Sequence, residues 1–304
     1  MMQRIVFASG KGGTGKTTLT ALTARLLSDG GAPIALADCD VEAANLPIAL
    51  GAHAASREPF VGGLKAVIDP ERCRGCGACT SACRFDALGP DEDYYRTRTY
   101  VVDPWACEGC GACTPTCPHD AITMERSQAG EVIAAESSIG PMVYGRLAPG
   151  EDLSGKLVTE VRRQADEVAS ERGIGRMWID GPPGVGCPAI AAITGTDVVV
   201  GVTEPTISGE HDLMRLVTLA RRFKIPVAVV LNKADLSADG AQRLRDRLTA
   251  EGLELIAEIP YDTAVARIPE QLARGEEFAY PVTPGMDAIR TVATWLSEHQ
   301  EPAG

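Results

Sequence analysis

The most constraining feature of the sequence is a glycine-rich stretch near its start, between a short apolar run and a helical pattern. Residues 5–8 are apolar and predict a buried strand, and leucines at helical spacing follow residue 18. Within SGKGGTGKTT, residues 9–18, Gly10, Gly15, Lys16 and Thr17 fill the template G-x-x-x-x-G-K-[ST]. In this strand–loop–helix context, the stretch predicts a phosphate-binding loop of an α/β domain.

The residue types of this loop suit a bound phosphate chain. Glycines let successive backbone N–H groups face phosphate oxygens, and the helix that begins near Thr17 adds the positive end of its dipole. We expect Lys16 to contact the β- and γ-phosphates and the Thr17 hydroxyl to bind Mg²⁺. The alternative, a glycine-rich turn without a ligand, fits the complete motif poorly. The predicted nucleotide-binding residues of the loop are Gly10, Lys11, Gly12, Gly13, Thr14, Gly15, Lys16, Thr17 and Thr18.

Two further apolar runs end in acidic residues. Residues 34–37 precede Asp38 and Asp40, and residues 177–179 precede Asp180 and a Gly-Pro-Pro-Gly turn. In open α/β sheets, ligands bind at the carboxyl ends of the strands, so these carboxylates are candidate site residues. Asp180 fits the Walker B role of holding Mg²⁺. Ordinary turn residues are the alternative for Asp38 and, less readily, for Asp40.

Eight of the ten cysteines lie in a segment that repeats itself with an offset of 34 residues. Each copy has the spacing C-x₂-C-x₂-C-x₃-C, which is typical of bacterial ferredoxins that carry two [4Fe-4S] clusters. In that pattern the fourth cysteine of each copy binds the cluster of the other copy. The predicted ligands are Cys73, Cys76, Cys79 and Cys117 for one cluster, and Cys83, Cys107, Cys110 and Cys113 for the other. Zinc is the alternative, but zinc modules favour pairs of cysteines that are far apart.

The α/β pattern resumes after this segment with a short strand expected at 132–135, so we expect an inserted domain. The predicted division is a discontinuous nucleotide-binding domain, 1–60 and 127–304, and a ferredoxin domain, 61–126. The net charge of −12 and the lack of a Lys/Arg block argue against a nucleic-acid partner. The first residues run straight into the loop without room for a signal peptide, and no apolar run is long enough to span a membrane, so we expect a cytoplasmic protein. In a cytoplasmic chain the ten cysteines favour metal over disulfides.

The second lysine of the loop, Lys11, makes the motif resemble the deviant P-loop of the MinD/ParA/Mrp ATPases, which belong to the SIMIBI class of P-loop NTPases. The resemblance implies a mostly parallel sheet with helices on both faces, and a homodimer in which Lys11 contacts the nucleotide of the other subunit. It also implies that Asp40 activates the attacking water and that Asp38 supports Mg²⁺. MinD has a basic amphipathic tail for the membrane, whereas residues 287–304 here are mixed and include Glu298, so no membrane partner is expected.

The same resemblance assigns the base-binding side of the site. Asn232 begins the string N-K-x-D, and Pro260 follows the next apolar run. In the MinD group an Asn at this place contacts adenine, which favours ATP over GTP, and the segment at Pro260 flanks the base. In Mrp-type carriers a C-P-x-C pair holds a cluster between two subunits. Here only Cys187 of that pair is present, which makes it a candidate extra site, with a buried thiol as the better prediction.

Three functions are compatible with these features. The first is an ATPase that couples the nucleotide state of a homodimer to electron transfer from two [4Fe-4S] clusters to a partner metalloprotein. The second is an ATP-dependent factor that assembles or carries iron-sulfur or other metal cofactors, as Mrp-type relatives do. The third is a positioning ATPase in which the ferredoxin domain is structural. Four cysteines for each cluster favour the first, because a fully ligated cluster suits a retained redox centre.

Overall fold

The computed structural model describes residues 2–29, 31, 33–276 and 279–299, so the end of the mixed C-terminal tail, residues 300–304, lies outside the described residues. The chain divides into two compact units. Unit 1 comprises Met1–Glu58, Val132–Arg146 and Ser154–Gly304, and unit 2 comprises Pro59–Glu131 and Leu147–Leu153. The division expected from the sequence assigned residues 59–60, 127–131 and 147–153 to the larger domain, but these residues belong to unit 2.

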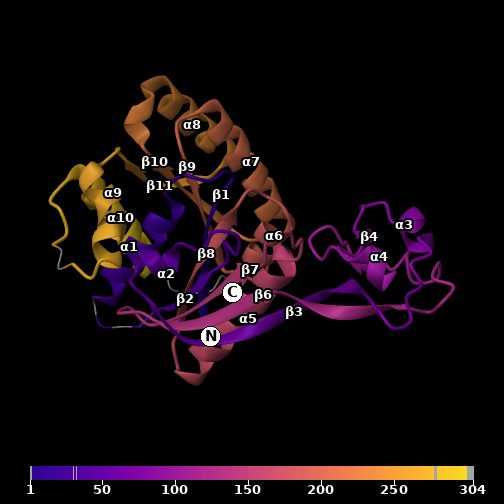
Figure 1. Cartoon of the computed structure of the whole chain (residues 1–304). Helices are drawn as coiled ribbons and strands as arrows, with labels where there is room; N and C mark the ends of the chain where they lie inside the picture. Colours follow the sequence, from indigo (N-terminus) through magenta and orange to yellow (C-terminus); the bar gives the residue numbers. More distant parts are fainter. Residues whose placement is uncertain (1, 30, 32, 277–278, 300–304) are drawn as a thin grey trace. The chain divides into compact units, whose positions relative to one another are not determined.

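A nine-stranded sheet has the order β11-β10-β9-β1-β8-β2-β7-β6-β3 (Figure 1). The pairings of β1 with β8 and β9, of β10 with β9 and β11, and of β2 with β7 and β8 are all parallel. The predicted α/β class with a mostly parallel sheet is therefore confirmed. The strands are β1 (Gln3–Ser9), β2 (Ala35–Asp38), β3 (His53–Ile68), β6 (Ile122–Glu136), β7 (Pro141–Leu147), β8 (Arg176–Pro183), β9 (Val198–Thr203), β10 (Val227–Asn232) and β11 (Glu254–Ile259).

Helices cover both faces of this sheet in unit 1. Phe7, Trp178 and Val230 pack in one core cluster with residues of α1 and α10. Val229 and Leu231 lie in another cluster with residues of α7 and α8, as expected because successive strand residues face opposite sides. The helices of unit 1 are α1 (Lys16–Ser28), α2 (Leu46–Ala49), α5 (Ser154–Glu171), α6 (Cys187–Ile193), α7 (Ile207–Arg222), α8 (Ala238–Glu251), the 3₁₀ helix η1 (Ala234–Leu236), α9 (Thr263–Ala273) and α10 (Pro284–Glu298).

Two strands depart from the sequence prediction. Residues 132–135 predicted a short strand, but they are the last part of the 15-residue β6. The long strand β3 was not predicted, because its first seven residues are exposed and show no alternation. β3 contains Pro59 and forms the edge of the sheet, the position at which a strand tolerates a proline.

Unit 2 is small and contains two short strands and two short helices besides its share of β3 and β6. These elements are α3 (Ala78–Ala82), β4 (Leu88–Pro90), α4 (Tyr94–Thr97) and β5 (Tyr100–Val102). The strands β4 and β5 pair antiparallel. The buried core of unit 2 consists of cysteine and alanine residues together with one leucine and one isoleucine. Among the residues that the structure describes, no helix combines the length and apolarity needed to cross a membrane.

Candidate functional site

The predicted phosphate-binding loop connects β1 to α1. Gly13 and Gly15 have φ angles of 78° and 87°, in the left-handed region that favours glycine. At Gly10 a side chain is excluded for another reason, since its Cβ would lie 2.2 Å from the Cβ of Asp212. The loop therefore requires glycine at these three positions, which explains why the stretch is rich in glycine.

Lys16 of the loop is buried and paired with Asp180 of β8. The Nζ of Lys16 lies 2.7 Å from Oδ1 of Asp180, and the Thr17 hydroxyl donates to Oδ2 of the same carboxylate at 2.6 Å. Burial disfavours the ammonium charge, but Asp180, Asp38 and Asp40 outweigh it and the pKa of Lys16 is raised. Lys16, Thr17 and Asp180 thus form one connected group, as expected for residues predicted to share a phosphate and a metal ion.

Asp38 lies beside this group on the neighbouring strand. Asp38 and Asp180 are direct partners in the parallel register of β2 and β8. The Asp38 carboxylate accepts from the backbone N–H groups of Asp40 at 3.0 Å and Leu46 at 2.9 Å. Burial, and next the charge of Asp180, raise the pKa of Asp38 to about 8. Two adjacent buried carboxylates of this kind are suited to a divalent cation.

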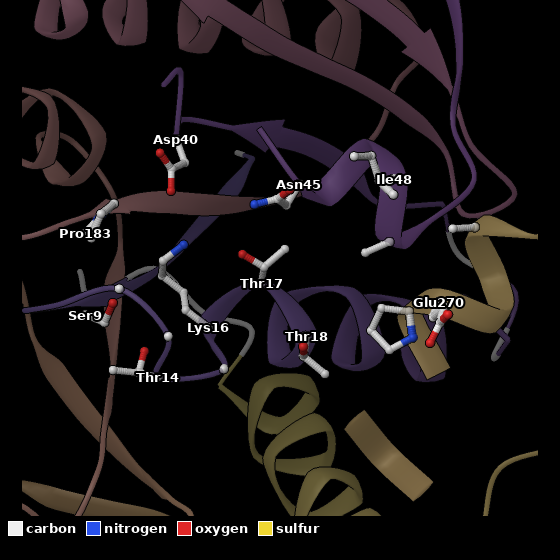
Figure 2. Close-up of a pocket in the computed structure, with 16 residues that line it drawn as sticks. Ser9, Thr14, Lys16, Thr17, Thr18, Asp40, Asn45, Ile48, Pro183 and Glu270 are labelled. Atoms are coloured by element: carbon white, nitrogen blue, oxygen red, sulfur yellow. The ribbon is translucent and has the colours of Figure 1, made fainter. Parts of the chain in front are cut away.

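A cavity opens over the loop, and Figure 2 shows Asp40 and Asn45 across it from Lys16 and Thr17. Burial raises the pKa of Asp40, with Lys16 acting in the opposite direction. The far wall comes from α2 and α9, which supply Ile48 and Glu270 among others. Motif reasoning missed this wall, because helical residues distant from the loop carry no phosphate-binding signature.

Lys11 turns toward its own subunit. Its Nζ lies 3.0 Å from Oε2 of Glu204, at the end of β9, and 3.4 Å from the Thr206 hydroxyl. The other carboxylate oxygen of Glu204 binds Lys233 at 2.5 Å, and Lys233 also donates to the carbonyl of Gly13 at 3.0 Å. Glu204 lies in no motif and was not identified from the sequence, and of the string N-K-x-D only Asn232, and not Lys233, was assigned to the site.

Asn232 contacts the loop backbone as well as a second cavity. Its Nδ2 donates to the carbonyl of Thr14 at 2.7 Å. The cavity beside it is lined by Asn232, Pro260 and Tyr261, the two segments predicted to flank the base. Asp235, the last residue of N-K-x-D, accepts from the backbone N–H of Tyr261 at 2.7 Å. One oxygen of its carboxylate therefore holds the Pro260 segment in place.

In unit 2 the eight clustered cysteines line two separate cavities. Each cavity collects three cysteines of one copy and the fourth of the other. One is lined by Cys73, Cys76, Cys79 and Cys117, and the other by Cys83, Cys107, Cys110 and Cys113. These are the two sets of four that the spacing predicted.

The backbone of unit 2 repeats along with the sequence. Asp69 donates its N–H to the carbonyl of Ala121, and Asp103, 34 residues later, donates to Ala87. Asp86 and Asp120 share the left-handed conformation, with φ of 51° and 46°. The two copies therefore exchange equivalent contacts, which is the arrangement that brings the fourth cysteine of each copy to the other.

The thiols surround these cavities and do not meet at a point. All ten cysteines are free, and within residues 2–299, apart from the gaps at 30, 32 and 277–278, no group of three or more His, Cys, Asp or Glu residues could hold a single metal ion. Backbone N–H groups point at two of the sulfurs, from Ala66 to Cys107 at 3.5 Å and from Ala121 to Cys117 at 3.4 Å. The potential ligands are thus eight thiols, and two of their sulfurs accept a backbone N–H group.

The two remaining cysteines differ from each other. Cys39 is fully buried after β2, and burial raises the pKa of its thiol, as expected for a core residue. Cys187 is exposed, so the prediction of a buried thiol is wrong. Cys187 is the first residue of α6 and directly follows Gly186, in the turn after β8. Few residues cover its side chain at this position.

A family model for the CobQ/CobB/MinD/ParA nucleotide binding domain matches residues 5–273. The uncharacterized protein MJ0578 of Methanocaldococcus jannaschii is 33% identical over 238 residues, which cover 78% of this chain and 80% of that protein. A second protein of that organism, the uncharacterized protein MJ0579, is 28% identical over 97% of this chain and 98% of its own length. The match to the family model includes residues of all three segments of unit 1 and the whole of unit 2.

Solved structures give the same fold. The septum site-determining protein MinD of Pyrococcus horikoshii, in complex with Mg-ADP, has a TM-score of 0.55 at 19% identity and covers 98% of this chain and 97% of its own. The cell division ATPase MinD of Pyrococcus furiosus also has a TM-score of 0.55, at 21% identity, and covers 98% of this chain and 99% of its own. With its phosphate-binding loop and parallel sheet, the chain belongs to the CobQ/CobB/MinD/ParA family of nucleotide-binding proteins.

Proposed function

We propose that the protein is an ATPase that holds two [4Fe-4S] clusters and couples the nucleotide state of a homodimer to electron transfer toward a partner metalloprotein. The observation that carries this proposal is the pair of cavities in unit 2, each lined by four thiols drawn from both copies of the repeat. The family fold supports the nucleotide part, and the cysteines support the redox part.

The nucleotide part follows from the groups around the loop. Asp180 binds both Lys16 and Thr17. Asp180 and the Thr17 hydroxyl would hold Mg²⁺, which would neutralise phosphate charge there, and Lys16 would contact the β- and γ-phosphates. Asp40 lines the same cavity, and its raised pKa improves it as an acceptor for the proton of the attacking water. Hydrolysis then gives ADP and inorganic phosphate.

The homodimer is proposed from Lys11. Glu204 is an anionic partner for this lysine within one subunit, so the contact with the partner's nucleotide requires an exchange of one anion for another. A triphosphate is the more highly charged anion and, unlike Glu204, is present only when ATP is bound. The exchange would make association of two subunits depend on ATP.

The residues of unit 2 fit [4Fe-4S] clusters. Thiolates are the ligands of these clusters, and the left-handed glycines between the cysteines let the backbone approach closely: Gly75, Gly77, Gly109 and Gly111 have φ of 61–74°. A zinc ion with bonds of about 2.3 Å would instead draw four sulfurs to one point. Bound clusters would supply one-electron redox centres, and four protein ligands for each suit retention in the protein.

A second candidate function is assembly or transfer of iron-sulfur or other metal cofactors. The exposed Cys187 favours it, because an accessible thiol beside the turn after β8 could share a labile metal group with the same residue of a partner subunit. Such a group would have only two protein thiols, which suits release more than retention.

Anaerobic purification followed by iron and acid-labile sulfide counting and EPR tests the proposal. We expect the iron and sulfide of two [4Fe-4S] clusters, and a rate of cluster reoxidation by an added acceptor that differs between ATP, ADP and no nucleotide. Lys16→Ala is the matched control, which should keep the clusters and lose the response to ATP. An iron-free protein, or cluster behaviour that ignores the nucleotide, would overturn the proposal. ATP-dependent transfer of iron to an apo-protein that Cys187→Ser abolishes would select the second function.

A further inference from the structure

The two cysteine cavities of unit 2 can be compared residue by residue, because the 34-residue offset relates their linings. We call the cavity with Cys73, Cys76, Cys79 and Cys117 cavity A, and the cavity with Cys83, Cys107, Cys110 and Cys113 cavity B. Apart from the cysteines, the glycines and several alanine or aliphatic pairs are conserved between them. The related positions are Ile68 and Val102, Gly77 and Gly111, Ala78 and Ala112, Ala121 and Ala87, and Ile122 and Leu88.

At three related positions the side chains differ in charge or polarity. At all three, cavity A has the more positively charged or more polar residue. Cavity A has Arg74 where cavity B has Glu108. It has His119 where cavity B has Phe85, and Tyr100 where cavity B has Ala66. Cavity A is therefore lined by a cation and two side chains that can donate hydrogen bonds, whereas cavity B is lined by an anion and two apolar side chains.

The tyrosine is placed to act on cavity A. A Cβ at Gly77 would lie 3.3 Å from the Tyr100 hydroxyl, so this hydroxyl stands directly over the loop between Cys76 and Cys79. A ring edge of Tyr94 packs against Tyr100, with centroids 5.6 Å apart, and holds it there. At the related position of cavity B, Ala66 offers only its backbone N–H to Cys107.

Reduction adds one negative charge to a cluster, so nearby cations and hydrogen-bond donors raise its reduction potential, and nearby anions lower it. On the basis of the proposed function, in which each cavity holds a [4Fe-4S] cluster, we propose that the cluster in cavity A has the higher reduction potential. The first electron taken up would then reside there. The centre in cavity B is then the stronger reductant. The duplication would thus have produced two unequal centres, with a downhill direction for an electron from B to A.

Other charges near cavity B do not reverse this order. Lys65 donates to the carbonyl of Cys107 at 2.9 Å, but it is paired with Glu151 at 3.1 Å and adds no net charge. Arg84 follows Cys83 directly, yet it is exposed and does not line cavity B. Near cavity A, Arg72 is in turn paired with Asp120, at 3.9 Å. The unequal charges that remain on the linings are those of Arg74 and Glu108.

An anaerobic redox titration followed by EPR tests this order on the full-length protein, after iron and sulfide have been counted. We expect two resolved midpoint potentials. Glu108→Gln should raise only the lower one, and Arg74→Gln should lower only the upper one. The double variant Arg74→Glu/Glu108→Arg should bring the two together or exchange them. Tyr100→Phe should lower the upper midpoint without the loss of iron that a merely structural role would cause.

Matched controls remove the same charges elsewhere in unit 2. Glu92→Gln and Arg126→Gln change exposed residues that line neither cavity, and both should leave the two midpoints in place. If Glu108→Gln moves the upper midpoint, or if both clusters of the wild-type protein have the same midpoint potential, the proposed order is wrong even though the clusters are present. A protein without iron contradicts the proposed function itself, so the two failures are distinguishable.

Discussion

Glu204 binds Lys11 of its own chain, with 3.0 Å between the carboxylate oxygen Oε2 and the lysine Nζ. The same carboxylate binds Lys233, and together the two lysines lower the pKa of Glu204 against the opposing effect of burial. Residues 11 and 204 come from the ends of the adjacent parallel strands β1 and β9. This ion pair holds Lys11 against its own subunit.

Removing the charge of Glu204 should therefore promote ATP-dependent dimerisation. In Glu204→Gln the lysine no longer leaves an anion when it moves to the partner's nucleotide. Because the pair is partly exposed, we expect the dimer dissociation constant to fall by about two- to fivefold. Sedimentation equilibrium with Mg-ATP measures it. Glu210→Gln on α7 is the matched control, and Lys11→Ala should show no ATP-dependent dimer in either background. Weaker association of Glu204→Gln would contradict the proposed exchange.

Loss of Lys16 should affect stability as well as activity. Its ammonium compensates Asp180 and acts on Asp38, both fully buried. Truncation to alanine leaves these carboxylates without a cation, and removal of one partner of a buried pair costs about 3–5 kcal/mol. We expect Lys16→Ala to abolish phosphate release and to lower the unfolding free energy of the nucleotide-free protein by that order.

Urea denaturation with two further variants checks the interpretation. Lys16→Ala/Asp180→Asn should be less destabilised than the sum of the single variants, since the double change also removes one of the uncompensated charges. Lys156→Ala alters an exposed lysine and should leave stability nearly unchanged. Additive effects of the two single changes would show that the pair contributes nothing as a pair.

The raised pKa of Asp38 predicts a pH dependence for the metal-free protein. The native carboxyl has a pKa of about 8, because burial and Asp180 disfavour its charge, whereas an unfolded aspartate ionises near pH 3.9. Between these values the native state holds a proton that the unfolded state has lost, so stability falls as pH rises and levels off above about 8, with a slope of at most about 1.4 kcal/mol per pH unit.

Urea unfolding in the presence of a chelator, across this pH range, measures the effect. Asp38→Asn removes the titrating group and should flatten the profile, even if its overall stability is lower through the altered hydrogen bond to Asp40 or Leu46. The exposed Asp152→Asn should keep the wild-type slope. Equal slopes in wild type and Asp38→Asn would place the dependence elsewhere.

What the sequence could predict depended on whether the relevant residues are close along the chain. The α/β fold followed from apolar runs with helical segments between them, and the phosphate-binding loop followed from ten consecutive residues. The grouping of cysteines into two sets followed from a fixed spacing repeated at a fixed offset. In each case a pattern of residue types along the sequence was enough to predict the structure.

The features that were missed depend on tertiary packing. Glu204 and Lys233 reach the loop only because β9 lies beside β1 in the sheet and β10 lies beside β9. The exposed start of β3 has no periodicity, since an edge strand with polar residues on both faces gives no pattern to read. The exposure of Cys187 was mispredicted for the same reason, because burial at a helix start depends on which segments cover it.

Asn232 is expected to stabilise the loop that receives the nucleotide. Its hydrogen bond to the Thr14 carbonyl fixes the turn at the left-handed Gly15. Because one such bond contributes about 0.5–1.5 kcal/mol, Asn232→Ala should weaken ATP binding by up to about tenfold in isothermal titration calorimetry. Asp235→Asn should not change the ratio of the ATP and GTP affinities, since the Asp235 carboxylate accepts the N–H of Tyr261. A loss of base selectivity in that variant would instead assign Asp235 to the base.

Thiol labelling can separate the two candidate functions, because the ten cysteines fall into three classes: eight around the cavities, Cys39 buried and Cys187 exposed. In iron-loaded, nucleotide-free protein, iodoacetamide should alkylate Cys187 alone, and Cys187→Ser should take up no label under the same anaerobic conditions. Labelling of any cavity cysteine would show that the clusters lack the expected ligands. If ATP protects Cys187 from alkylation only when added iron and sulfide are present, this thiol binds a shared metal group and the carrier function gains support. Protection by ATP alone would mean that association of two subunits covers α6 without any metal.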